Sequence, residues 1–344
     1  MQTGDQHCIS QLRTLLSIAL FGASGYACSA SAQSTSVTLE IGVGTSVLSV
    51  AASSALGRYR IVSALPDDNG GVYVLSVADN EMRAYITHGD ETSKLELARL
   101  GKGGVLAPTR LLLLPGGHHA VLDRVHGLIP LQGAAAFGES ARVLHPVATA
   151  SDGCVFRDKI LFLGYQEDKL LHEYSLDGRR GRSFAAAPRG DNLAHRQTLS
   201  SGLIACDSSA AHVFLGFRYS GEVRGVERNG RVTWAMRLPG FTGPIVRSIG
   251  NGVSVAMGPG KTYTLSAVGF IAQELLLIQA EERLVDPQGK RSVLTWLLDA
   301  RTGDVRGTQA DLPTFAFISH TRVIARKEPS LSVLSYEFRL RRVN

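Results

Sequence analysis

The sequence lacks the features that mark several large classes of protein. No apolar run of about 20 residues follows the N-terminal region, which argues against an internal membrane-spanning helix. No C-x-x-C pair occurs, so the spacing typical of zinc-ribbon and thioredoxin-like redox sites is missing. The G-x-S-x-G elbow of α/β-hydrolases and the phosphate-binding loop G-x-x-x-x-G-K-[ST] are also absent. Helical periodicity is nearly missing, which favours a chain built from strands.

Lysine is scarce, and the basic excess is mild. The chain has 36 Lys and Arg against 30 Asp and Glu, a formal net charge of +6, with only 7 Lys against 29 Arg. The bases are scattered except at the C-terminal end, where Arg339, Arg341 and Arg342 lie close together. A nucleic-acid-binding protein is expected to gather its bases on one face or segment. We therefore expect no nucleic-acid partner.

Residues 1–32 are typical of a secretory signal peptide. Arg13 precedes the apolar run 15–21, and a small-residue stretch ends in the A-x-A pattern of residues 30–32. Acylation of Cys28 in a lipoprotein is the alternative, but Gly25 stands where such sites carry an apolar residue. We expect export to the periplasm or the exterior, and a mature protein of residues 33–344 without a membrane span.

A repeat with an offset of 52 residues is the most informative feature. ILFLGY at 160–165 aligns with HVFLGF at 212–217, LDGR at 176–179 with RNGR at 228–231, and Cys154 with Cys206. Asp-Gly and Asn-Gly between apolar runs predict hairpins, because Gly and Asn accept positive φ in tight turns. Each copy therefore consists of strands.

Looser copies of the same outline occur along the chain. The apolar second strands of six copies are predicted to begin near residues 72, 119, 161, 213, 275 and 323. The long spacing of the fifth copy is attributed to an insertion around 281–290. Residues 37–47 alternate in polarity, which predicts a half-buried strand before the first copy. That strand, in the N-terminal segment 33–57, is expected to pair with the last copy and remove exposed sheet edges.

These copies predict an all-β, six-bladed β-propeller of four-stranded antiparallel blades over residues 58–344. One four-stranded unit cannot bury its apolar faces alone, whereas a ring of such units shares one core. A pair of β-sandwiches is the rival architecture, but it does not explain a near-repeat of 52 residues.

The pattern resembles the secreted propellers of the NHL type. The resemblance rests on VADNEMRAY at 77–85 and YSLDG at 174–178, and only two or three copies match at residue level. It implies the fold. It leaves function open, because that family includes lyases, lactonases, receptor ectodomains and proteins without an assigned activity.

The central channel of the predicted propeller is the expected ligand site. Its inner strands are expected to begin at 60–62, 109–111, 145–147, 195–197, 244–246 and 315–317. This arrangement makes Arg110, His145, His195 and Arg196 the candidate ligand-binding residues. Arginine binds anions through its planar fork, but each arginine has the alternative of pairing with an acid of the channel wall.

A metal site is the sharper hypothesis for the histidines. In the lyases that the resemblance suggests, one ligand from each of three blades holds a catalytic metal. His320 lies just beyond the sixth inner strand. The plainer interpretation is that His145 caps backbone groups at a strand entry and that His195 lies in the polar loop 190–197. No chelating pair spacing occurs, so we predict no bound metal and no cofactor.

Cys154 and Cys206 leave two states open. They occupy equivalent positions of adjacent copies, and a disulfide requires Cα atoms about 4.4–6.8 Å apart. Equivalent inner-strand positions are expected to lie slightly farther apart, which favours two separate buried thiols over a bond.

The function expected from sequence is an exported, monomeric binding or protein-interaction module. Its ligand is unknown, with a glycan, a peptide or a cell-envelope protein as the partners considered. A metal-assisted lyase or hydrolase with a histidine site in the channel is the alternative.

Overall fold

Strands form nearly all of the regular structure in this computed structural model of the chain. The structure describes residues 36–42, 44–50, 59–66, 71–78, 83–88, 95–96, 107–115, 118–125, 127–131, 149–207, 212–272, 274–284, 291–320, 322–327 and 331–343. Within them lie 26 strands and one helix, α1 (Leu193–Leu199). No helix in this part of the chain is both long and apolar enough to cross a membrane. The expected signal peptide and Cys28 fall outside the described residues.

Antiparallel pairing joins the described strands into six sheets of three to five strands and one separate hairpin. The first three sheets are β3 (Tyr59–Pro66), β4 (Val72–Ala78), β5 (Arg83–His88) and β6 (Leu95–Glu96); β7 (Pro108–Leu114), β8 (His118–Asp123) and β9 (Gly127–Leu131); and β10 (Asp152–Phe156), β11 (Lys159–Gln166), β12 (Lys169–Ser175) and β13 (Arg180–Ala186). The next two are β14 (Gly202–Asp207), β15 (His212–Phe217), β16 (Glu222–Glu227) and β17 (Val232–Arg237); and β20 (Tyr263–Ala272), β21 (Leu275–Glu282), β22 (Val293–Asp299) and β23 (Val305–Ala310). The last is β24 (Thr314–Ile318), β25 (Arg322–Lys327) and β26 (Leu331–Val343), joined by β1 (Ser36–Ile41) and β2 (Thr45–Val50).

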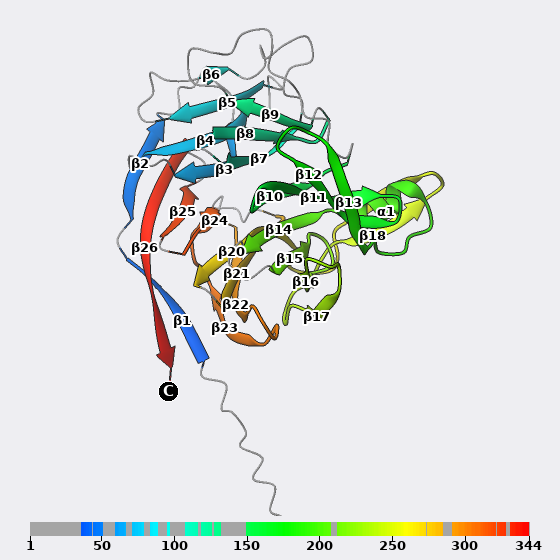
Figure 1. Cartoon of the computed structure of the whole chain (residues 1–344). Coiled ribbons are helices and arrows are strands. Elements are labelled where there is room, and N and C mark those ends of the chain that lie inside the picture. Colours follow the sequence, from blue (N-terminus) through cyan, green and yellow to red (C-terminus); the bar gives the residue numbers. More distant parts are fainter. Residues whose placement is uncertain are drawn as a thin grey trace, which may run out of the picture. The chain divides into compact units, whose positions relative to one another are not determined.

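The first strands of the six sheets form a closed ring. Each contacts the first strands of two neighbouring sheets, in the order β3, β7, β10, β14, β20, β24 and back to β3. In Figure 1 these strands lie toward the middle of the ring, and β6, β17 and β23 lie toward its outside. The architecture is the β-propeller that the repeat predicts.

Burial on both faces explains why the second strands carry the clearest repeat. Six consecutive residues of β11 and five of β15 are buried. Both faces of these strands pack against other parts of the ring, so their apolar residues form runs rather than alternating with polar ones. The outer strand β17, by contrast, alternates between exposed and half-buried positions. The second strands begin at Val72, His118, Lys159, His212, Leu275 and Arg322, which confirms the six expected starts.

The structure corrects part of the expected inner-strand set. Residues 60–62, 109–111 and 315–317 do lie on first strands, and 145–147 fall outside the described residues. Residues 195–197 lie instead in α1, and 244–246 lead into a hairpin, β18 (Ile245–Ile249) with β19 (Gly252–Ala256). This hairpin, inserted between the fourth and fifth sheets, produces the long spacing that was attributed to 281–290.

The N-terminal strands complete the last sheet. The strand expected over 37–47 is two strands, β1 and β2, and both pair antiparallel with β26. Gln309 of β23 secures β1, because its side chain accepts from Leu39 N at 2.9 Å and donates to Leu39 O at 3.1 Å. The first and last described strands thus pair through their backbones, and β1 is also tied to the fifth sheet.

Candidate functional site

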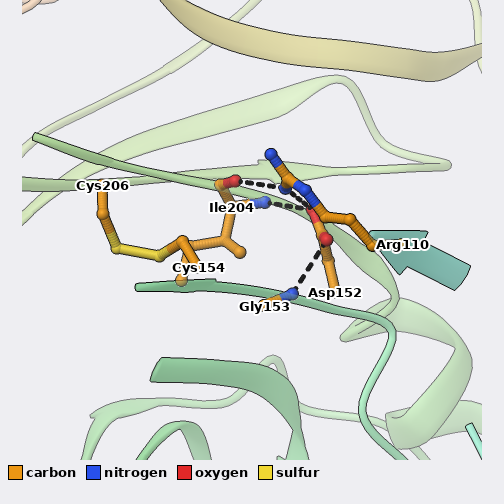
Figure 2. The surroundings of a disulfide bond; sticks show 6 residues. All are labelled: Arg110, Asp152, Gly153, Cys154, Ile204 and Cys206. Carbon is orange, nitrogen blue, oxygen red and sulfur yellow. Dashed lines mark hydrogen bonds and ion pairs between the residues drawn. A yellow bond between two sulfur atoms is a disulfide. The ribbon is translucent and has the colours of Figure 1, made fainter. Parts of the chain in front are cut away.

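Arg110 lies on β7 in the channel wall, where an acid neutralises it. Its Nη1 donates to Asp152 Oδ2 at 2.7 Å and to Ile204 O at 2.9 Å. Asp152 also accepts from Ile204 N at 2.9 Å and from Gly153 N at 2.8 Å, as Figure 2 shows. The network therefore joins the first strands β7, β10 and β14, and Arg110 has the wall-acid partner considered as its alternative. A ligand-binding role for Arg110 stays a prediction.

A disulfide joins Cys154 of β10 to Cys206 of β14, with Cα atoms 6.0 Å apart. The expectation of two separate thiols is therefore wrong. Two residues before the cysteines, Asp152 Oδ2 accepts from Ile204 N, and this bond holds the two strands together. Equivalent positions of these neighbouring sheets consequently lie within disulfide reach.

Arg196 lies on a helix outside the first strands. Asn192 begins the helix α1 by accepting from the backbone N–H of His195 at 2.8 Å, an N-cap that the sequence interpretation overlooked. The Arg196 Nη1 donates to Tyr165 Oη at 2.8 Å and to Asp168 Oδ1 at 3.1 Å. The hydrogen bond from Tyr165, together with Arg196, lowers the pKa of Asp168. Arg196 thus connects α1 to the third sheet, and ligand binding by it remains untested.

The described histidines do not converge. His195 lies on α1, and its Nδ1 is 3.3 Å from Asp191 Oδ2. The His320 ring packs near Phe270, with ring centroids 6.3 Å apart. Among the residues that the structure describes, no group of three or more His, Cys, Asp or Glu side chains is placed to hold a metal ion. His145 falls outside these residues. The lyase or hydrolase alternative stays a prediction.

The structure gathers a different set of residues at one mouth of the channel. A cavity of about 500 Å³ opens where the first strands begin and the second strands end. Its charged lining consists of Arg124, Arg218, Arg291, Arg326 and Glu281. Arg124 and Arg218 directly follow β8 and β15, and Arg326 lies near the end of β25. The propeller repeat therefore brings three separate arginines to the same end of the ring.

Glu281 is already occupied by two of these arginines. Its carboxylate binds Arg326 Nη2 at 2.5 Å and lies 3.7 Å from Arg291 Nη1. Arg326 also donates from Nη1 to Ile61 O at 3.0 Å, which ties the last sheet to the first. The Glu281 side chain is 6% exposed, so it is fixed among its neighbours. Arg291 and Arg326 thus have an acidic partner within the cavity wall.

Arg218 differs from them. It lines both this cavity and a narrower one of about 60 Å³ that reaches Arg110 and Asp152. Its Nε is buried and has no hydrogen-bond partner within the described part of the chain. Burial lowers the pKa of Arg218, and the nearby charge of Arg124 lowers it further, while Asp152 and Glu281 act in the opposite direction. Both of these acids are already bonded to other arginines.

The sequence predicts a basic channel, and ligand binding by Arg110, His145, His195 and Arg196 stays a prediction. That prediction used only the first strands, whereas three of the four cavity arginines, Arg124, Arg218 and Arg326, follow or end second strands. The pairs Asp123–Arg124, Phe217–Arg218 and Ala325–Arg326 each place an arginine at the end of an apolar run. Aligning the copies at the ends of their second strands is the signal that finds this set.

Comparison with known proteins shows the fold alone. No family model and no curated protein matches the chain. A solved member of the DUF4221 family from Bacteroides vulgatus superposes with a TM-score of 0.56 at 8% identity, covering 90% of this chain and 100% of that one. A protein described as exported, from Bacteroides fragilis, gives 0.50 at 10% identity over 90% and 96% of the two chains. An auxiliary nutrient binding protein from Bacteroides thetaiotaomicron gives 0.47 at 8% identity over 87% and 77%. This chain is thus similar to solved β-propellers in architecture.

Proposed function

We propose that the protein is an exported, six-bladed propeller that binds a small polar ligand in the cavity at the channel mouth. One observation carries the proposal: strands from five of the six sheets contribute to a single cavity of about 500 Å³ with charged groups converging in it. Concave sites with a few convergent polar groups are the usual ligand sites of folded domains. Each of the six sheets is counted as one blade, and the hairpin β18–β19 is an insertion.

The cellular setting of this proposal comes from the sequence. The signal peptide of residues 1–32 directs the mature chain to the periplasm or the exterior, and a lipid anchor on Cys28 is the less favoured option. The disulfide between Cys154 and Cys206 suits an oxidising compartment. The resemblance to NHL propellers, which are secreted, is consistent with this setting. Membership of that family and a monomeric state both stay proposals.

The site is tested by blocking it. Ser266 lines the cavity, and Ser266→Trp fills its wall with an indole, while Ser254→Trp places the same ring on the inserted hairpin. Residues 33–344 are screened by thermal unfolding against neutral sugars, amino acids, peptides and small anions. A ligand that raises the unfolding midpoint of the wild type and of Ser254→Trp, but leaves that of folded Ser266→Trp unchanged, supports the cavity. A ligand that binds all three proteins equally contradicts it.

A further inference from the structure

The cavity at the channel mouth carries more positive charge than its own acids neutralise. Four arginines line it against one glutamate. Asp152, in the adjoining narrow cavity, is bonded to Arg110 and so adds no free negative charge. Among the described lining residues, the excess is therefore three positive charges. These charges come from separate sheets, so the ring itself holds them together.

Arg218 and Arg124 carry the least compensated part of this charge. Arg218 is half-buried, its Nε has no hydrogen-bond partner within the described part of the chain, and Arg124 acts on it as a like charge. Guanidinium groups stay protonated at all ordinary pH values, so the pair cannot relieve its repulsion by losing a proton. Arg124 is exposed and Arg218 is half-buried, so water screens this repulsion only in part. An anion in the cavity removes that unfavourable term.

Arg291 and Arg326 line the same cavity, but their charges are compensated by an acidic side chain. Glu281 binds both, and Arg326 is bonded to Ile61 O. Displacing Glu281 from Arg326 leaves a buried carboxylate unpaired, which is strongly unfavourable. These two arginines therefore hold the shape of the cavity, and Arg218 with Arg124 is left to receive a ligand.

We propose that the ligand of this cavity is an anion with at least two negative charges, held by the guanidinium groups of Arg218 and Arg124. This inference rests on the proposed function, since it names the class of ligand for the same cavity. Phosphate monoesters and dicarboxylates share the required chemistry, because they carry two ionisable acidic groups and the planar fork of arginine matches their paired oxygens. A single charge neutralises only one of the two guanidinium groups, whereas a dianion neutralises both.

The test uses probes of defined charge on residues 33–344. Binding is measured by calorimetry at constant ionic strength with inorganic sulfate and phosphate as one arm, succinate and citrate as the other, and acetate and glucose as low-charge comparisons. The two arms distinguish an oxyanion ester from a carboxylate as the natural chemistry. We expect at least one dianion to bind clearly more tightly than acetate, which in turn binds more tightly than glucose.

Three variants locate the binding. Arg218→Gln and Arg124→Gln remove one guanidinium each, and Arg301→Gln removes an exposed arginine from the turn after β22 as the matched control. We expect dianion affinity to fall about tenfold or more in the first two variants, since a charge-assisted bidentate contact is lost. Arg301→Gln is expected to bind like the wild type. Unfolding midpoints without ligand show whether each variant is folded. Arg218→Gln is expected to unfold at or above the wild-type midpoint, because it removes the repulsion with Arg124 and breaks no hydrogen bond of Nε.

The outcomes separate the two proposals. Equal dianion affinity in the wild type, Arg218→Gln and Arg124→Gln overturns the anion assignment. If a neutral ligand is blocked by Ser266→Trp and unaffected by Arg218→Gln, the cavity still binds a ligand and only the anion class is wrong. If neither charged nor neutral probes are affected by Ser266→Trp, the proposed function fails as well.

Discussion

The bond network around Asp152 makes a quantitative prediction about what holds the ring together. Asp152 is 2% exposed and accepts hydrogen bonds from Arg110, Ile204 and Gly153. The variant Asp152→Asn keeps the shape of the side chain but removes its charge and one acceptor oxygen. Its amide N–H then faces either the Arg110 guanidinium or a backbone N–H, which are also donors.

The size of the effect follows from burial. Removing one partner of a buried ion pair costs about 3–5 kcal/mol, and a buried N–H left without an acceptor costs about 1–3 kcal/mol. The Arg110 side chain is 28% exposed, so water compensates part of the loss and the two terms do not add fully. We expect Asp152→Asn to lower the free energy of unfolding by about 3 kcal/mol.

Equilibrium unfolding in urea, followed by circular dichroism, measures this change. The control is Glu40→Gln, which breaks the exposed pair with Arg341, whose side chains are 53% and 73% exposed. Exposed pairs contribute about 0–1 kcal/mol, so this variant is expected to unfold close to the wild type. A loss of less than about 1 kcal/mol for Asp152→Asn, no larger than that of the control, refutes the account of the network.

Three further predictions concern other parts of the fold. Replacing Cys154 and Cys206 by Ser is expected to lower the free energy of unfolding by about 4 kcal/mol, because the disulfide closes a loop of 52 residues in the unfolded chain. Mass spectrometry of the wild type is expected to show a gain of two hydrogens on reduction. Gln309→Ala removes both hydrogen bonds to the Leu39 backbone and is expected to cost about 1–3 kcal/mol in urea unfolding, whereas a cost near zero argues against β1 as a stabilising strand. Burial lowers the pKa of His172 below its usual value of 6.5, so protonation favours the unfolded chain and stability falls as the pH drops below about 6.5. His172→Gln is expected to show a smaller loss between pH 7.5 and pH 5.5, and an unchanged loss contradicts this assignment.

The sequence predicted the ring because the repeat is clearest in the second strands, and burial on both faces constrains these strands most strongly. The second strands, such as β11 and β15, are buried on both faces, so their apolar runs and glycines persist from copy to copy. Connections between sheets are under weaker constraint. The helix α1 and the hairpin β18–β19 interrupt the repeat there. Residues 195–197 and 244–246 lie in these two elements, although their sequence pattern predicts the starts of first strands.

The candidate site was harder to predict for a geometric reason. Arg124, Arg218 and Arg326 are far apart in the sequence, and each follows or ends a different strand without a local motif. Only closure of the ring brings them to one cavity. The disulfide illustrates the same limit, because the reach between Cys154 and Cys206 depends on how closely two neighbouring sheets approach. Aligning strand ends across the copies identifies such positions, but the partner of each arginine is visible only in the folded chain.

Anomalous diffraction from crystals of residues 33–344 soaked in selenate tests the central claim most directly. Selenate is a tetrahedral dianion whose selenium atom reports its own position. The account predicts a selenium peak in the channel-mouth cavity, with selenate oxygens about 2.7–3.2 Å from the guanidinium nitrogens of Arg218 and Arg124, and loss of that peak in Arg218→Gln. Selenium peaks only on the outer surface, or a cavity peak that persists unchanged in Arg218→Gln, would contradict it.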